Sequence, residues 1–280
     1  MGQFMSALFF ESDDTPSKTF EAIVDKYETF DELRLALRHA GLESSSLVLA
    51  IDYTKSNEVR PLHYFLNKTV VQWSGERTFG GKCLHTITPN VVNPYQSVIH
   101  IMGHTLEAFD DDKLIPALVF GDIKTGASGC YLLGGTPCQG FAQVLQRYAE
   151  LTPSIQLSGP TNFAPVIRET IDIVKRTREY HILVIVADGQ VSNERETRDA
   201  IVEASNYAIS IIMVGVGDGP WDMMEEFDDG LPRRQFDNFQ FVEYNRLLRL
   251  NPRAPEVGFA TAALMEVPDQ FKAIRRLGLL

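Results

Sequence analysis

The chain has 280 residues, 44% of them hydrophobic and 22% charged, and a formal net charge of −11. This length suits one large α/β domain with an added N-terminal segment, and the composition allows a sizeable buried core. The negative charge opposes contact with a phosphate backbone, so we expect no nucleic-acid partner. Three cysteines without CxxC spacing indicate neither a disulfide framework nor a zinc site, and favour a reducing, cytoplasmic location.

Residues 1–45 are predicted to form an N-terminal segment that is partly disordered and then helical. Residues 1–18 are mostly polar after a short apolar start, and the chain has no apolar run of transmembrane length. The start matches the N-myristoylation pattern, with Gly2 followed by Ser6, although a pattern this short also arises by chance. An acyl chain on Gly2 would give only reversible, peripheral contact with the plasma membrane.

A helix is expected from about Phe20 to Ala40. Thr29 and Glu32 have the spacing of a capping box, in which each residue's side chain bonds the other's backbone amide. Apolar residues then recur on one helical face, and Gly41 supplies a stop.

Residues 46–280 are predicted to form one domain of alternating strands and helices. Continuous apolar runs, typical of strands buried on both faces, occupy 47–51, 115–120, 181–187 and 209–216. Amphipathic segments of helical length occupy 95–109, 141–151, 163–178 and 196–206. This alternation predicts a doubly wound, mostly parallel sheet with helices on both faces. We also expect an antiparallel edge strand over 126–133, a last strand over 239–242 and a closing helix over 261–267.

Oxygen-bearing side chains stand at three of the predicted strand or helix ends. Asp52, Thr54 and Ser56 follow the first buried strand, Thr161 precedes a helix, and Asp188 follows the strand 181–187. Ligands of such sheets bind beyond the carboxyl ends of the strands, so these groups are expected to meet there. Each residue also suits an ordinary turn or cap, but their joint occurrence favours one shared site.

The donor set fits a hard divalent cation. Mg²⁺ takes six oxygens and keeps several waters, so the hydroxyls of Thr54, Ser56 and Thr161 are candidate direct ligands. Asp52 and Asp188 are candidates for holding metal-bound waters. Neutral direct ligands would leave the metal electron-poor and able to accept a carboxylate from a protein partner.

The same residues carry a resemblance to a known family. Asp52-x-Thr54-x-Ser56 with Thr161 and Asp188-Gly189 is similar to the metal-ion-dependent adhesion site of von Willebrand factor A domains. The chain resembles the copine subgroup, and most closely the copine-like domain of plant-type RING ubiquitin ligases. The segments that indicate this are IDYTKSN (51–57), LIPAL (114–118), GPTNFAP (159–165), IVADGQV (185–191), VGVGDGPW (214–221) and FDNFQFV (236–242). The resemblance implies a von Willebrand factor A-like fold, Mg²⁺, Mn²⁺ or Ca²⁺ at the site, and protein partners.

Two departures from this pattern limit what the resemblance implies. No cysteine follows Asp188, so we expect no RING in this chain and no ubiquitin-ligase activity from it alone. The stretch Glu58–Gln72 is longer than the matching loop of the ligase-like relatives and is interpreted as a surface insertion.

The leading hypothesis is therefore a metal-dependent protein-binding module, not an enzyme, in intracellular signalling or recruitment at membranes. The alternative is the substrate-receptor part of a RING-type ligase, and a metal-assisted hydrolase ranks lower because no dedicated general base is evident. Gly215-x-Gly217 is interpreted as a turn, since a dinucleotide loop needs a third glycine. His100 and His104, which have helical i, i+4 spacing without an HExxH glutamate, are expected to be surface or helix-packing residues, and Asp110–Asp112 to be solvated.

Overall fold

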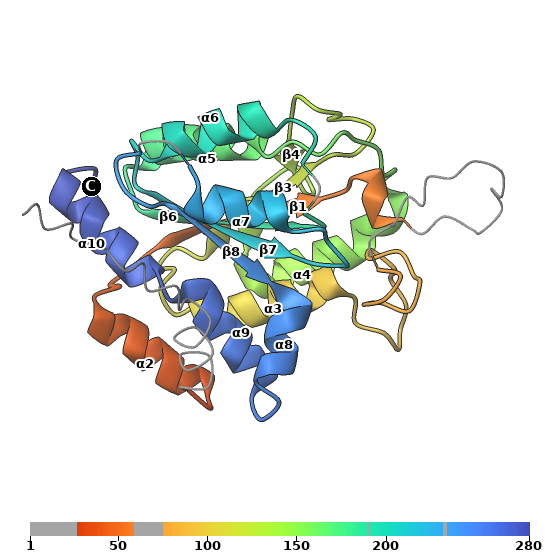
Figure 1. The fold of residues 1–280 in the computed structure, drawn as a ribbon, viewed down its shortest axis with the longest axis horizontal. Helices are drawn as coiled ribbons and strands as arrows, with labels where there is room; N and C mark the ends of the chain where they lie inside the picture. The colour runs from red at the N-terminus through yellow and green to blue at the C-terminus, as the bar shows by residue number, and fades with distance from the viewer. Residues whose placement is uncertain (1–26, 59–74, 190, 232–233) are drawn as a thin grey trace, which may run out of the picture.

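A six-stranded sheet lies at the centre of the computed structural model, which describes residues 27–58, 75–189, 191–231 and 234–280 (Figure 1). Its strand order is β4-β3-β1-β6-β7-β8, and only β4 runs antiparallel to its neighbour. The strands are β1 (Ser46–Asp52), β3 (Ala117–Phe120), β4 (Tyr131–Leu132), β6 (His181–Ala187), β7 (Ile209–Gly215) and β8 (Phe239–Glu243). The predicted mostly parallel sheet is confirmed.

Helices cover both faces of this sheet (Figure 1). On one face lie α5 (Ala164–Thr177) and α6 (Glu194–Ala204), which pack against each other. On the other lie α3 (Pro94–Leu106), α4 (Gly140–Leu151) and α9 (Pro255–Leu264). Three further helices are α7 (Asp222–Asp229), α8 (Tyr244–Leu250) and α10 (Val267–Leu277).

The central strands form because their apolar runs are buried on both faces. All seven residues of β6 and of β7 are buried, which is typical of a parallel sheet covered by helices. The register aligns Ile51 of β1 with Val186 of β6, so both strands end at the same edge of the sheet. Asp52 and Asp188 are thereby delivered to neighbouring strand ends.

Two predicted elements differ from the structure because of proline. The run 115–120 is split at Pro116, which has no amide hydrogen for the ladder. β2 (Leu114–Ile115) pairs instead with β5 (Cys138–Gln139) in a separate two-stranded sheet. The closing helix over 261–267 was placed wrongly: α9 ends at Leu264, and α10 begins at Val267 with Pro268 in its first turn.

The helix α2 (Phe30–Ala40) has the predicted capping box and ends at Gly41, where φ is +108°. The helix predicted from about Phe20 is wrong over residues 27–29, because the extended backbone of Thr29 caps the helix at its start. Its buried residues Leu33 and Leu37 face the domain, and α2 contacts α3, α9 and α10. The division of the chain at residue 45 stays a prediction. The predicted disordered start, Gly2 and all but the first residue of the insertion Glu58–Gln72 lie outside the described residues.

Among the helices of the described residues, none combines the length and the apolar character needed to cross a bilayer.

Candidate metal centre

The first three predicted site residues form one hydrogen-bonded group after β1. The Asp52 carboxylate accepts from the Thr54 amide through Oδ1 (2.8 Å) and from the Thr54 hydroxyl through Oδ2 (3.0 Å). The Thr54 and Ser56 hydroxyl oxygens lie 3.0 Å apart. The chain turns here through a short 3₁₀ helix, η1 (Lys55–Asn57), and this turn brings alternate side chains together. Asp52, Thr54 and Ser56 therefore converge as predicted.

Gly121, which follows β3, packs directly against this group. A Cβ atom on Gly121 would lie 2.3 Å from Thr54 Cγ2 and 3.0 Å from Asp52 Oδ1. Its φ of +77° also lies in the left-handed region that favours glycine. Gly121 is thus required beside the candidate site, although the sequence shows it only as the residue that ends an apolar run.

Asp188 lies close enough to Asp52 for their charges to interact. Both residues are completely buried. Burial, followed by the negative charge of Asp188, raises the pKa of Asp52 well above its usual range, and hydrogen bonds from Thr54 oppose this. A divalent cation would relieve both causes at once, because it neutralises the paired charge and replaces lost hydration. The pair of buried carboxylates therefore fits a cation.

The loop that carries Thr161 and leads into α5, called the Thr161 loop, lies between the loops that follow β1 and β6. Upstream of Thr161, the Ser158 carbonyl accepts from the Lys55 amide at 2.6 Å. Thr161 itself accepts through its carbonyl from the Ser192 amide at 3.0 Å, and its side chain is buried. The loop that carries Thr161 is therefore bonded on one side to the Asp52 group and on the other to the segment after Asp188. That the five residues hold a metal stays a prediction.

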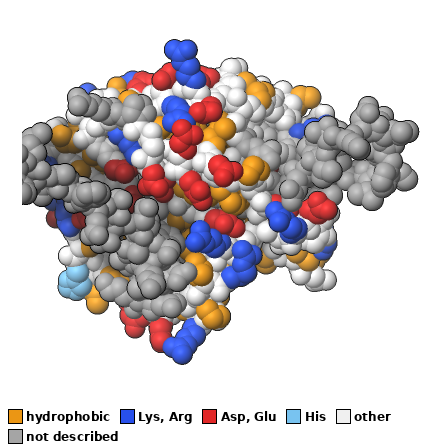
Figure 2. Space-filling model, viewed as in Figure 1, with side chains coloured by type: hydrophobic (Ala, Val, Ile, Leu, Met, Phe, Trp, Pro, Cys, Tyr) orange, Lys and Arg blue, Asp and Glu red, His pale blue; other side chains and the backbone are white. Residues whose placement is uncertain are grey.

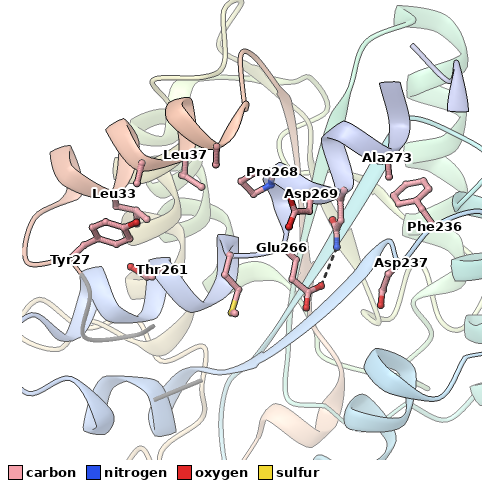
Figure 3. Close-up of a pocket in the computed structure, with 14 residues that line it drawn as sticks. Tyr27, Leu33, Leu37, Phe236, Asp237, Thr261, Glu266, Pro268, Asp269 and Ala273 are labelled. Carbon is pink, nitrogen blue, oxygen red and sulfur yellow. Dashed lines mark hydrogen bonds between the residues drawn. The ribbon is translucent and has the colours of Figure 1, made fainter. Parts of the chain in front are cut away.

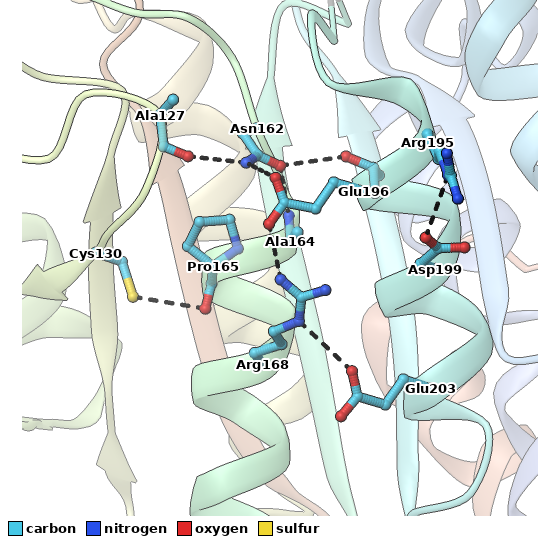
Figure 4. A network of polar contacts seen from close by, with 11 residues as sticks. Ala127, Cys130, Asn162, Ala164, Pro165, Arg168, Arg195, Glu196, Asp199 and Glu203 are labelled. Carbon is cyan, nitrogen blue, oxygen red and sulfur yellow. Dashed lines mark hydrogen bonds and ion pairs between the residues drawn. The ribbon is translucent and has the colours of Figure 1, made fainter.

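Asn162 fixes the direction in which the Thr161 loop enters α5 (Figure 4). Its side-chain amide donates to the Ala127 carbonyl (2.8 Å) and to Glu196 Oε2 (2.9 Å), and its Oδ1 accepts from the Ala164 amide (3.0 Å). Glu196, on α6, is in turn held by Arg168 of α5 at 2.8 Å. These contacts connect the candidate site to the outer helices.

A second network, centred on His85, supports the backbone of Asp52. His85 Nε2 lies 2.7 Å from the Asp52 carbonyl and must donate to it, because a carbonyl only accepts. The ring stacks between Tyr53 and Tyr95, at centroid distances of 4.4 and 4.0 Å. Burial lowers the pKa of His85 to about 3, so the ring is neutral and its Nδ1 accepts from the Tyr148 hydroxyl at 2.8 Å.

Asn57 completes the support of the loop. Its Nδ2 donates to the Thr54 carbonyl at 3.1 Å, and its Oδ1 accepts from the Tyr95 hydroxyl at 2.7 Å. Tyr95 comes from α3, so this bond joins a helix on one face of the sheet to the strand end.

Trp221 covers the turn that follows Asp188. A Cβ on Gly189, whose φ is +90°, would lie 2.1 Å from the Trp221 ring, and one on Gly215 would lie 2.6 Å from it. The indole is only partly buried and packs on Phe241 at 5.5 Å between centroids. The ring therefore explains the glycine in the turn after Asp188 and the glycine at the end of β7.

Sequence reasoning missed several of these supporting residues and misplaced one group. His85 was given no role from the sequence, but it is buried in a loop between tyrosines, which no local pattern indicates. Asp110 was expected to be solvated but is only 3% exposed, and burial raises its pKa to about 7. Within the described part of the chain, no three His, Cys, Asp or Glu side chains cluster as a metal site.

Comparison with known proteins decides the family. The family model described as Copine matches residues 83–280, well over half of the chain. The chain belongs to the copine family. It is 50% identical over 262 residues to Copine family protein 2 of Caenorhabditis elegans, which covers 92% of this chain and 3% of that protein. It is 46% identical over 282 residues to the E3 ubiquitin-protein ligase RGLG5 of Arabidopsis thaliana, covering 94% of this chain and 61% of the ligase.

This copine-family chain spans less than two thirds of the length of either relative. Among solved structures, it is similar to manganese-loaded Plasmodium vivax TRAP protein, with a TM-score of 0.45 and 14% identity over 76% of this chain and 74% of that chain. The predicted copine-type resemblance and the likeness to plant ubiquitin ligases are confirmed.

Proposed function

We propose that this copine-family chain is a divalent-metal-dependent protein-binding module without catalytic activity of its own. In this proposal Thr54, Ser56 and Thr161 contact Mg²⁺, Mn²⁺ or Ca²⁺, and Asp52 and Asp188 hold waters bound to it. The bound cation would keep one coordination position that a carboxylate of a partner protein can occupy. The proposed setting is cytoplasmic signalling or recruitment at membranes.

The observation that carries this proposal is the group formed by Asp52, Thr54 and Ser56 beside a second buried carboxylate, Asp188. Two buried carboxylates near one another are unfavourable without a compensating positive charge. The hydroxyls beside them are neutral oxygen donors of the kind that hard cations accept. Membership of the copine family supports the same interpretation.

Metal titration of the purified chain tests the proposal. We expect Mg²⁺ or Mn²⁺ to raise the unfolding temperature, with about 2.7 kcal/mol of stabilisation at a metal concentration of 100 Kd. Thr161→Ala should weaken metal affinity by about tenfold or more, because it removes one proposed ligand. Thr177→Ala, at the far end of α5, is the matched control and should leave metal binding unchanged. Identical metal responses in Thr161→Ala and wild type would contradict the assignment.

Partner capture tests the second half of the proposal. A pull-down from a cell extract, with partners identified by mass spectrometry, should lose its specific proteins when EDTA is added or when Asp52 is changed to Asn. Capture that is indifferent to EDTA would show that the metal does not bridge the partner.

The similarity to RGLG5 favours a second candidate, the substrate-receptor part of a RING-type ubiquitin ligase. The chain has only Cys83, Cys130 and Cys138, too few for the Cys/His cluster of a RING. We therefore expect no ubiquitin chains from this chain with the activating and conjugating enzymes alone. Chain formation under those conditions would instead make it an enzyme.

Attachment at membranes is proposed through Gly2. Intact-mass measurement of the chain expressed in a eukaryotic host should show a myristoyl group on Gly2, and its absence would remove this route to the plasma membrane.

A further inference from the structure

A groove of about 620 Å³ lies between α2 and the α9–α10 corner (Figure 3). Its α2 wall is formed by Leu33, Leu37 and the half-buried Ala36 and Ala40, and its opposite wall by Thr261 and Met265. This volume lies within the ~300–1,000 Å³ of clefts that enclose ligands or several side chains. Figure 1 places α2 and α10 at the end of the molecule away from the loop after β1, so the groove is separate from the candidate metal centre.

Carboxylates border this apolar groove. Asp237, Glu266 and Asp269 line it, and Glu266 accepts a 3.4 Å hydrogen bond from Gln270. Burial, followed by the charge of Asp237, raises the pKa of Glu266 to about 7. An occupant that brings further carboxylates would add to this repulsion, so the groove favours an apolar segment without negative charge.

The sequence itself contains such a segment, ahead of the residues that line the groove. Residues 1–10 read MGQFMSALFF and have no charged side chain, and five large apolar residues lie between Phe4 and Phe10. Acidic residues begin only at Glu11. Tyr27, the first described residue, lines the groove, so residues 11–26 are the connector between segment and groove. Sixteen extended residues span up to about 55 Å, which is ample for return into the groove.

We propose that the apolar segment Phe4–Phe10 docks in the groove between α2 and the α9–α10 corner of its own chain. The tether favours this occupant, because linkage through a short connector can give an effective concentration in the millimolar range. The apolar side chains of the segment cover the α2 wall, and the acidic residues from Glu11 onward stay outside the acidic border.

Binding of a separate peptide to the full chain tests the proposal. A fluorescent peptide of residues 2–12 is titrated into the wild type and into the Leu8→Asp/Phe9→Asp chain, whose own segment can no longer dock. We expect the peptide to bind the double variant at least ~10-fold more tightly than the wild type, where the tethered segment competes. Equal affinity for both chains, or no binding to the double variant, would overturn the proposal.

Matched substitutions on α2 locate the binding. Ala36→Glu, which places a carboxylate in the groove, should abolish peptide binding to the double variant, whereas Leu35→Glu should not, because Leu35 is 57% exposed on the same helix. Ala40→Glu replaces Ala36→Glu if circular dichroism shows that the latter is unfolded. If the peptide still binds a folded chain that carries Ala36→Glu or Ala40→Glu, the segment does not dock in this groove. Light scattering must show the wild type as a monomer: a dimer that Leu8→Asp/Phe9→Asp dissociates would assign the groove to a second copy.

Discussion

Three separate stretches of the chain fix the side chain and backbone of Asp52. Thr54 bonds both carboxylate oxygens, His85 donates to the carbonyl, and Gly121 leaves the space that the Asp52 and Thr54 side chains occupy. The carboxylate is therefore held in position by the protein itself, which lowers the cost of ordering a binding site.

The space at Gly121 gives a direct test at the level of one methyl group. Gly121→Ala should destabilise the chain by about 2–4 kcal/mol, since it combines left-handed strain with a collision against Thr54. Gly126→Ala is the matched control: its φ is +51°, but nothing lies within 4 Å of the added Cβ, so only about 1 kcal/mol is expected. Urea denaturation measures the free energy of unfolding of both variants. Equal losses of stability would show that the atoms around Gly121 move away from the added methyl group without cost.

The helix pair α5–α6 acts as a unit that supports the Thr161 loop. Arg168 bonds Glu196 at 2.8 Å and Glu203 at 3.5 Å, and only Glu196 continues to Asn162. Arg168 and then Asn162 lower the pKa of Glu196, so this carboxylate stays charged at neutral pH. Because Glu196 lies on α6 and Asn162 precedes α5, their hydrogen bond holds the start of α5 in a fixed position relative to α6.

Glu196→Ala should therefore speed amide exchange in residues 159–164 and weaken metal affinity several-fold. Its effect on global stability should stay below about 1 kcal/mol, since the ion pair is largely solvated. Glu196→Gln, which keeps an acceptor for Asn162, should restore most of the protection, and Glu203→Ala, which removes only the longer contact, should resemble the wild type. Hydrogen exchange by mass spectrometry measures the exchange rates of residues 159–164. Equal rates in Glu196→Ala and Glu203→Ala would show that the contact of Glu196 with Asn162 does not position the Thr161 loop.

The negative charge of the whole molecule is unevenly spread. Acidic side chains gather over α7, with basic side chains over the neighbouring α8 (Figure 2). Asp228 of α7 is partly buried near Glu266, and burial, followed by the charge of Glu266, raises the pKa of Asp228 to about 8. Crowded carboxylates of this kind make folding sensitive to pH.

Stability should fall as the pH rises from 6 to 9. Between the usual pKa of an aspartate, near 3.8, and the folded value of about 8, the folded state holds a proton that the unfolded state has released. The stabilisation is thus complete below the lower pKa and is lost as the pH passes the higher one. Asp228→Asn should flatten the unfolding temperature against pH, whereas the exposed Asp222→Asn on the same helix should not. A wild-type profile that is flat over this range would contradict the prediction.

Much of the fold follows from local sequence patterns. The bounds of β6 and the residues of the capping box before α2 were predicted correctly, because burial on two faces and local capping leave direct sequence signatures. The helix itself was expected from about Phe20, but the capping box starts it at Phe30. The edge strand predicted over 126–133 is shorter, since β4 has only two residues. α7 and α8 were not predicted, as they are short and depend on packing against neighbours.

The candidate site, like the fold, was predicted from the sequence only in part. The spacing Asp52-x-Thr54-x-Ser56 determined one group, since residues on a single turn after a strand are bound to lie close together. Pairing of β1 with β6, the bonded Thr161 loop, and the stack of His85 between Tyr53 and Tyr95 were decided only by tertiary structure. Apart from the stack of His85 on Tyr95, these contacts join residues more than thirty positions apart, and their energy comes from burial and hydrogen bonds that no local segment can form alone.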